Sequence, residues 1–141
     1  MFRLVVDTDV MVAALESATG ASRQVLLRIL RGEAQALLST ALMLEYEAVL
    51  TRPNTLARSG LEAADIWKIL DEFARICSPV VFDYRWRPLA ADEDDDFVIE
   101  TAINGAADAI ASFNVRDIVK GAASFGIAVE RPALILRRMR Q

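Results

Sequence analysis

Short apolar runs alternate with longer stretches of helical periodicity along the chain. The first run, residues 2–6, is interrupted only by Arg3 and ends at Asp7, a pattern typical of a buried parallel strand. Further apolar runs predict strands at residues 36–39, 80–82, 109–111 and 127–129. The chain is therefore expected to build a sheet from five short strands.

Between these runs, apolar residues recur three and four positions apart, which indicates amphipathic helices. Ser22 is the predicted N-cap of the first helix and Gly32 its stop. The predicted helices cover residues 22–31, 41–51, 61–77, 95–104, 117–125 and a last segment after Pro132. The alternation of strand and helix predicts an α/β fold, a three-layer α/β/α sandwich with a central parallel sheet, in one domain over residues 1–141.

Composition narrows the possible chemistry. The chain has no histidine and one cysteine, Cys77, which excludes disulfide frameworks, Cys/His zinc sites and any mechanism with histidine as base. Its longest apolar runs are far shorter than the roughly 18 residues of a membrane span. We expect a soluble, cytoplasmic protein with no membrane partner, whose chemistry depends on carboxylates and hydroxyls.

Four acidic residues lie at positions where the sequence pattern predicts burial, and burial of an unpaired carboxylate is energetically costly. Asp7 ends the first strand, Glu45 lies on the apolar stripe of its helix, Asp95 aligns with the apolar face of the next acidic helix, and Asp117 follows the strand 109–111. Asp and Glu are rarely buried without a partner. We expect these four acids to converge on a shared cation, although a salt bridge to a core arginine remains an alternative for Glu45.

An all-oxygen ligand set without histidine favours Mg²⁺ or Mn²⁺. Such a metal polarises a phosphodiester and lowers the pKa of a bound water, which suits phosphate hydrolysis. Arg85, Arg87, Arg116 and the C-terminal arginines are the candidates for gripping a phosphate backbone. Thr8, Ser112 and Asn114 are candidates for orienting a ligand, with turn formation and helix capping as their ordinary roles.

Together these motifs resemble the PIN-domain ribonucleases, which include the VapC-like toxins of prokaryotic toxin–antitoxin pairs. The resemblance covers essentially the whole chain and rests on residues 5–10, on Ser39, on residues 44–50 and on the acidic segment that starts at Asp92. It implies a PIN-like fold in which the core metal-binding acids are Asp7, Glu45 and Asp95.

The resemblance is less definite at the fourth acid and in the first motif. Asp117 matches a more variable fourth acid, because the family often has an acid where Asn114 stands, and a subgroup has Asn there with Asp three residues later. The family usually has Asn where this chain has Asp9. Which of Asn114 and Asp117 completes the site is therefore left open.

The function that the resemblance implies is a metal-dependent endoribonuclease that hydrolyses RNA. All four acids would be catalytic through the metal, and Ser39 would join the residues that bind or orient the substrate. Family members of this type commonly form homodimers and bind a cognate antitoxin protein. Both partners are implied by the resemblance alone.

Two other functions compete with this one. A haloacid-dehalogenase-type phosphohydrolase would use Asp7 as nucleophile and Asp9 as acid/base, but it needs a lysine, for which only Lys68 and Lys120 are available, and it leaves Glu45 without a role. The second alternative is a non-catalytic PIN-like module that binds nucleic acid or a partner, which the amide at Asn114 favours.

Overall fold

The central sheet has five parallel strands in the order β3-β2-β1-β4-β5. The computed structural model describes residues 1–82 and 96–139 of the chain. The strands are β1 (Arg3–Val6), β2 (Gln35–Leu38), β3 (Ser78–Pro79), β4 (Ala109–Ala111) and β5 (Ala128–Glu130). This sheet confirms the predicted parallel α/β architecture.

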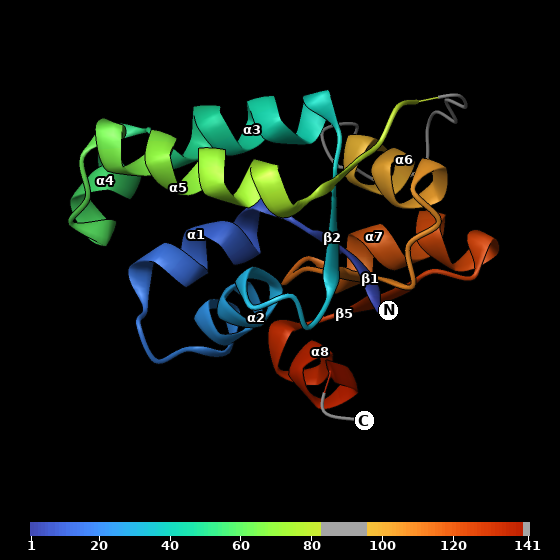
Figure 1. Cartoon of the computed structure of the whole chain (residues 1–141). Coiled ribbons are helices and arrows are strands. Elements are labelled where there is room, and N and C mark those ends of the chain that lie inside the picture. The colour runs from blue at the N-terminus through green and yellow to red at the C-terminus, as the bar shows by residue number, and fades with distance from the viewer. Residues whose placement is uncertain (83–95, 140–141) are drawn as a thin grey trace.

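Helices cover both faces of the sheet, so the predicted three layers are confirmed. The helices α3, α5 and α6 lie on one face, while α2 and α8 pack together on the other (Figure 1). The helices are α1 (Thr8–Glu16), α2 (Ala21–Leu30), α3 (Thr40–Leu50), α4 (Pro53–Ser59), α5 (Ala63–Ile76), α6 (Asp96–Asn104), α7 (Val115–Ala122) and α8 (Pro132–Met139), with a 3₁₀ turn, η2 (Ala123–Phe125). Among the described residues, none of these helices has the length and apolar content to cross a membrane.

Several element boundaries differ from the sequence prediction. The third strand was expected at residues 80–82 but lies at Ser78–Pro79, because the ladder to β2 pairs Leu37 with Ser78 and Leu38 with Pro79. The helix α2 starts at Ala21 with Gly20 as its N-cap, so Ser22 is a buried first-turn residue and not the cap. The helix α7 starts at Val115, two residues before the predicted start at Asp117.

The helices α1 and α4 were not predicted. The helix α1 begins directly after Asp7, and its buried face includes Val10, Met11 and Ala14. Asp7 is its N-cap, and its carboxylate accepts a hydrogen bond from the Thr8 N–H. The end of β1 is therefore also the start of a helix, which fixes the direction of the Asp7 side chain.

The sheet reverses its winding direction between β1 and β4. From β1 the chain adds β2 and then β3 on one side, and it returns to place β4 and then β5 on the other. The Asp7 N–H donates to the carbonyl of Ala111 over 2.9 Å, which joins the carboxyl ends of these two central strands. In open α/β sheets, ligands bind beyond such a junction.

A buried tyrosine ties α3 to the end of β1. Tyr46 has no exposed surface, and its hydroxyl donates to the carbonyl of Val6. Its ring meets that of Phe73 edge to face, with the ring centres 6.0 Å apart. Burial raises the pKa of Tyr46 well above its usual value, so the hydroxyl stays a neutral donor. Glu45, the neighbour of Tyr46 on α3, is held in place relative to Asp7 by this link.

Replacing Tyr46 by Phe tests the link. The ring contact with Phe73 is kept, but the buried carbonyl of Val6 loses its donor, so we expect the free energy of unfolding to fall by about 1–3 kcal/mol. Urea denaturation followed by circular dichroism measures the change, and the dependence on urea should keep its slope. An unchanged midpoint would show that the hydroxyl contributes nothing to stability.

Candidate metal centre

A hollow of about 380 Å³ lies at the carboxyl ends of β1 and β4. Four segments meet there: the start of α1, the middle of α3, the first turn of α6 and the loop before α7. The lining residues are Asp7, Thr8, Asp9, Val12, Glu45, Val49, Phe97 and Asn114. The structure thus brings together Asp7, Glu45, Thr8 and Asn114, all of which were predicted as site residues.

Asp7 is the most constrained of these residues. Its side chain is 7% exposed, and one carboxylate oxygen accepts the Thr8 N–H over 2.8 Å. The other oxygen accepts the Ser112 hydroxyl over 2.7 Å. The Ser112 oxygen in turn accepts the Asn114 N–H over 2.9 Å. Ser112 therefore positions the protein's own acid and loop, and it does not line the hollow.

A second aspartate joins the same network. One oxygen of Asp9 accepts the Phe113 N–H over 3.0 Å and lies 3.5 Å from the Ser112 hydroxyl oxygen. Asp7 and Asp9 thus approach the same hydroxyl from two neighbouring positions of the chain. The sequence prediction did not place Asp9 in the metal site, although its position two residues after Asp7 was a usable signal.

The electrostatics of the hollow are unfavourable for carboxylates alone. Burial, and next the charge of Asp9, raise the pKa of Asp7 from 3.8 to about 6, with a smaller contribution from Glu45. The hydrogen bonds from Ser112 and Thr8 oppose this shift. No Lys or Arg is among the described residues that line the hollow. A bound cation would relieve this repulsion.

The donor groups fit a hard divalent metal. Thr8 lines the hollow, and its hydroxyl oxygen is buried and has no hydrogen-bond partner among the described residues. With the carboxylates and the Asn114 amide, it completes a set of oxygen ligands suited to Mg²⁺ or Mn²⁺. Within residues 1–82 and 96–139, no three acids lie close enough to hold a metal together.

The two candidates for the fourth ligand, Asn114 and Asp117, differ in their position relative to the hollow. Asn114 lines the hollow, whereas Asp117 is half-buried in the first turn of α7 and does not line it. An acid in a first turn interacts favourably with the positive end of a helix. Arg116, beside it, is exposed. Asp95, Arg85 and Arg87 lie outside the described residues.

Ser39 has local partners within the fold. It is the N-cap of α3, and its hydroxyl oxygen lies 3.2 Å from the Leu42 N–H and 2.7 Å from the Thr101 hydroxyl. It lines a different hollow, of about 450 Å³, whose other lining residues are Thr40, Ala41, Leu44, Val80, Val81 and Phe82. That hollow is larger, but no carboxylate lines it among the described residues.

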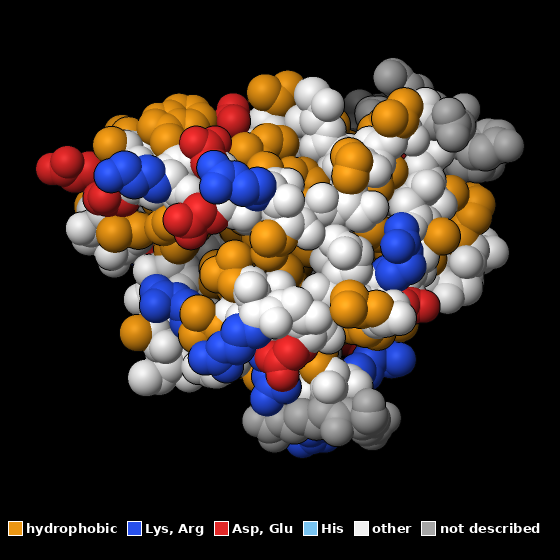
Figure 2. Space-filling model, viewed as in Figure 1, with side chains coloured by type: hydrophobic (Ala, Val, Ile, Leu, Met, Phe, Trp, Pro, Cys, Tyr) orange, Lys and Arg blue, Asp and Glu red, His pale blue; other side chains and the backbone are white. Residues whose placement is uncertain are grey.

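Of the C-terminal arginines, the structure describes Arg137 and Arg138, and Arg140 lies outside the described residues. Arg137 and Arg138 belong to the last turn of α8, which packs on α2, and Arg138 pairs with Glu130. Figure 2 shows basic side chains over this pair of helices. Neither Arg137 nor Arg138 lines the metal hollow.

The apolar part of the lining was also missed by sequence reasoning. Val12 and Val49 follow acids by one helical turn, and Phe97 comes directly after the acidic segment. Val12 could not be placed without the helix α1. Glu100, on α6, is fully buried although it does not line the hollow, and the pattern of the sequence gave no reason to single it out.

Residues 3–116 match the sequence model of a family described as the PIN domain. The matched stretch covers most of the chain and includes every residue that lines the hollow. It ends one residue before Asp117. A comparison with curated proteins found no match.

Replacing Asp7 by Asn is expected to stabilise the metal-free protein. The folded-state pKa of Asp7 lies above its unfolded value, so the ionised carboxylate costs stability above pH 6, and this cost disappears as pH falls from about 6 to 4. In chelator at pH 8 we expect a gain of roughly 1–3 kcal/mol for Asp7→Asn, which shrinks to nothing near pH 4. Asparagine still caps the helix.

Urea denaturation across this pH range measures the effect, with Asp117→Asn as control. Added Mg²⁺ should stabilise the wild type and not Asp7→Asn, because only the former binds it. A variant that is less stable than the wild type at pH 8 would show that Asp7 is not strained by burial and neighbouring charge.

Proposed function

The chain belongs to the PIN-domain family of metal-dependent nucleases, and we propose that it is an endoribonuclease that uses Mg²⁺ or Mn²⁺. The observation that carries this proposal is the group of carboxylates, Asp7, Asp9 and Glu45, that line one hollow, where burial and then the charge of Asp9 raise the pKa of Asp7 to about 6. Such an arrangement is costly for a fold and useful for binding a metal.

The metal would be held by Asp7 and Glu45, with Asp9 close by and Asn114 and Thr8 as neutral oxygen donors. When bound, it supplies an activated water and polarises the phosphodiester. The protein's own part is to position these oxygens. Ser112 and the Thr8 N–H hold both oxygens of Asp7, and the link from Tyr46 to Val6 fixes α3 relative to β1.

RNA as the substrate is supported by the resemblance to VapC-like toxins. The chain has no histidine, so a histidine-based route to RNA cleavage is excluded, and a metal-dependent route agrees with the carboxylates in the hollow. The same resemblance leads us to propose a toxin role, with a cognate antitoxin protein and a homodimeric assembly as its partners.

The phosphohydrolase alternative fits the hollow poorly. Lys68 lies on α5 and Lys120 on α7, both are exposed, and neither lines the hollow. Asp9, the acid/base of that alternative, is held by the Phe113 N–H. The non-catalytic alternative keeps one supporting observation, which is that an amide, Asn114, lines the hollow where a further carboxylate would strengthen metal binding.

Cleavage of a mixed RNA substrate tests the proposal. We expect fragments with Mg²⁺ or Mn²⁺ and none with chelator, and at least roughly 100-fold slower cleavage for Asp7→Asn and Glu45→Gln, because each removes a charged oxygen from the metal. Asp95→Asn, run beside them, tests the predicted acid that lies outside the described residues. Asp117→Asn should cleave at close to the wild-type rate.

Substrates run in parallel separate the alternatives. Release of phosphate from a generic phosphomonoester without RNA fragments would support the phosphohydrolase. RNA binding without cleavage in any metal would support the non-catalytic module. Cleavage of single-stranded DNA at the same rate would keep the nuclease and remove the preference for RNA.

A further inference from the structure

The metal hollow has an apolar part that metal binding does not require. Three of its lining residues, Val12, Val49 and Phe97, are apolar and partly buried. They come from three different helices, α1, α3 and α6. A phosphate and its metal are recognised by charge and by hydrogen bonds, so these side chains indicate that the ligand also has an apolar surface.

Each valine stands one helical turn after a polar residue that lines the same hollow. Val49 follows Glu45 by four residues on α3, and Val12 follows Thr8 by four residues on α1. Residues four apart share a helix face at a rise of about 6 Å. The helices α1 and α3 pack on each other, and each valine lies one turn further along its helix than Thr8 or Glu45.

Phe97 is the aromatic residue among the described residues that line the hollow. It lies in the first turn of α6, a helix that packs on α3, and only part of its ring is covered by the core. By contrast, the ring of Phe73 is 1% exposed. An aromatic ring that is partly exposed can stack on a nucleobase, because every nucleobase has a flat face.

We propose that Phe97, with Val12 and Val49, binds one nucleobase of the strand next to the phosphate that faces the metal. This inference rests on the proposed function, because it assigns a second part of the same substrate to the same hollow. A hollow of about 380 Å³ is within the range of about 300–1,000 Å³ typical of small-ligand sites. A base that is paired and stacked inside a nucleic-acid duplex cannot contact these three side chains, so the bound base is unpaired.

A double-mutant cycle between protein and RNA tests the contact. Labelled single-stranded RNAs of one sequence each carry a single abasic residue, which is moved along the strand. Wild type, Phe97→Ala and Phe97→Leu are compared by kcat/KM with Mg²⁺ and by fluorescence anisotropy with Ca²⁺ in place of Mg²⁺. Phe97→Leu keeps the apolar volume and removes the flat ring, so it serves if Phe97→Ala folds poorly.

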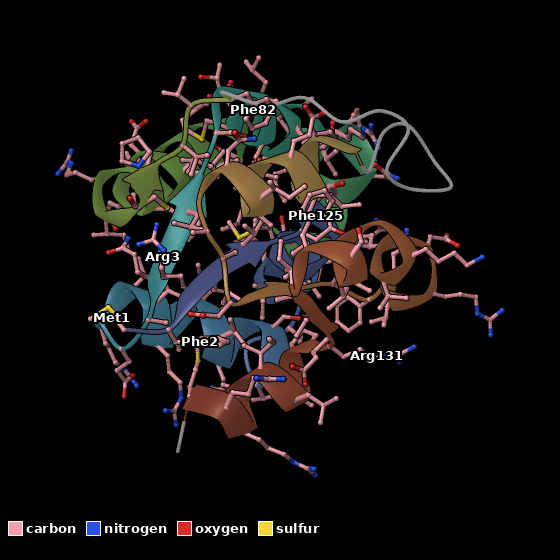
Figure 3. All side chains as sticks on the ribbon, turned by 90° about the vertical axis from the view of Figure 1, so that its right-hand side faces the viewer. Met1, Phe2, Arg3, Phe82, Phe125 and Arg131 are labelled. Carbon is pink, nitrogen blue, oxygen red and sulfur yellow. The ribbon has the colours of Figure 1, made fainter. Side chains whose placement is uncertain are left out.

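We expect the wild type to lose roughly tenfold at one abasic position. Phe97→Ala should lose about the same on intact RNA and nothing more on that abasic strand, because the two changes remove one contact. The matched control is Phe125→Ala: Phe125 lies in η2 after α7 (labelled in Figure 3), is 39% exposed and does not line the hollow. It should leave the abasic penalty unchanged.

Three results would overturn the inference while leaving the nuclease in place: additive losses from Phe97→Ala and base removal, no abasic position that matters to the wild type, or equal cleavage of the same sequence in a perfect duplex. If the wild type neither binds nor cleaves any strand with any metal, the proposed function is wrong, and the proposed base contact of Phe97 is wrong with it.

Discussion

The repulsion among carboxylates around Asp7 is the constraint on which the rest of the structure depends. Asp7 is buried, and the charges of Asp9 and Glu45 act on it from α1 and α3. A protein selected for stability alone would replace at least one of these acids. Here the opposing interactions are local and specific: one hydroxyl and one N–H hold the two oxygens of Asp7. The hollow is therefore preformed, and a cation would find its oxygens already in position.

Preformation requires that three distant segments be fixed to one another. The Asp7 N–H bonds to Ala111, the Phe113 N–H bonds to Asp9, and the Tyr46 hydroxyl bonds to Val6. The first two contacts join β1 and the start of α1 to the end of β4, and the third joins α3 to β1. Each satisfies a backbone polar group, so the fold satisfies its own polar groups and builds the site with the same bonds.

The sequence was sufficient to predict the parallel sheet and to single out two acids, Asp7 and Glu45, that line one hollow, because both follow from local patterns. An apolar run that ends in Asp7 predicts a strand end, and a helical stripe that contains Glu45 predicts a buried helix face; each pattern spans only a few residues. The helix α1 was missed because only Asp7, its N-cap, separates it from β1. Asn114 and Asp117 could not be ranked by pattern, since their separation depends on where α7 begins. The apolar lining formed by Phe97, Val12 and Val49 depends on packing among three helices, which no local sequence pattern predicts.

The mixed lining also bears on what such a hollow could select. In the proposed site, stacking on Phe97 and contact with two valines would favour any flat, unpaired base over a paired one, and they would discriminate little among the bases themselves. Discrimination requires a donor or acceptor at the edge of a base, and the described lining offers few groups for this: the carboxylates and the Thr8 hydroxyl face the cation in the proposed site. Asn114, whose amide both donates and accepts, is the remaining polar group. If the Asn114 amide binds the metal, the hollow would recognise only an unpaired base; if it hydrogen-bonds to the edge of a base, the hollow would also discriminate between bases.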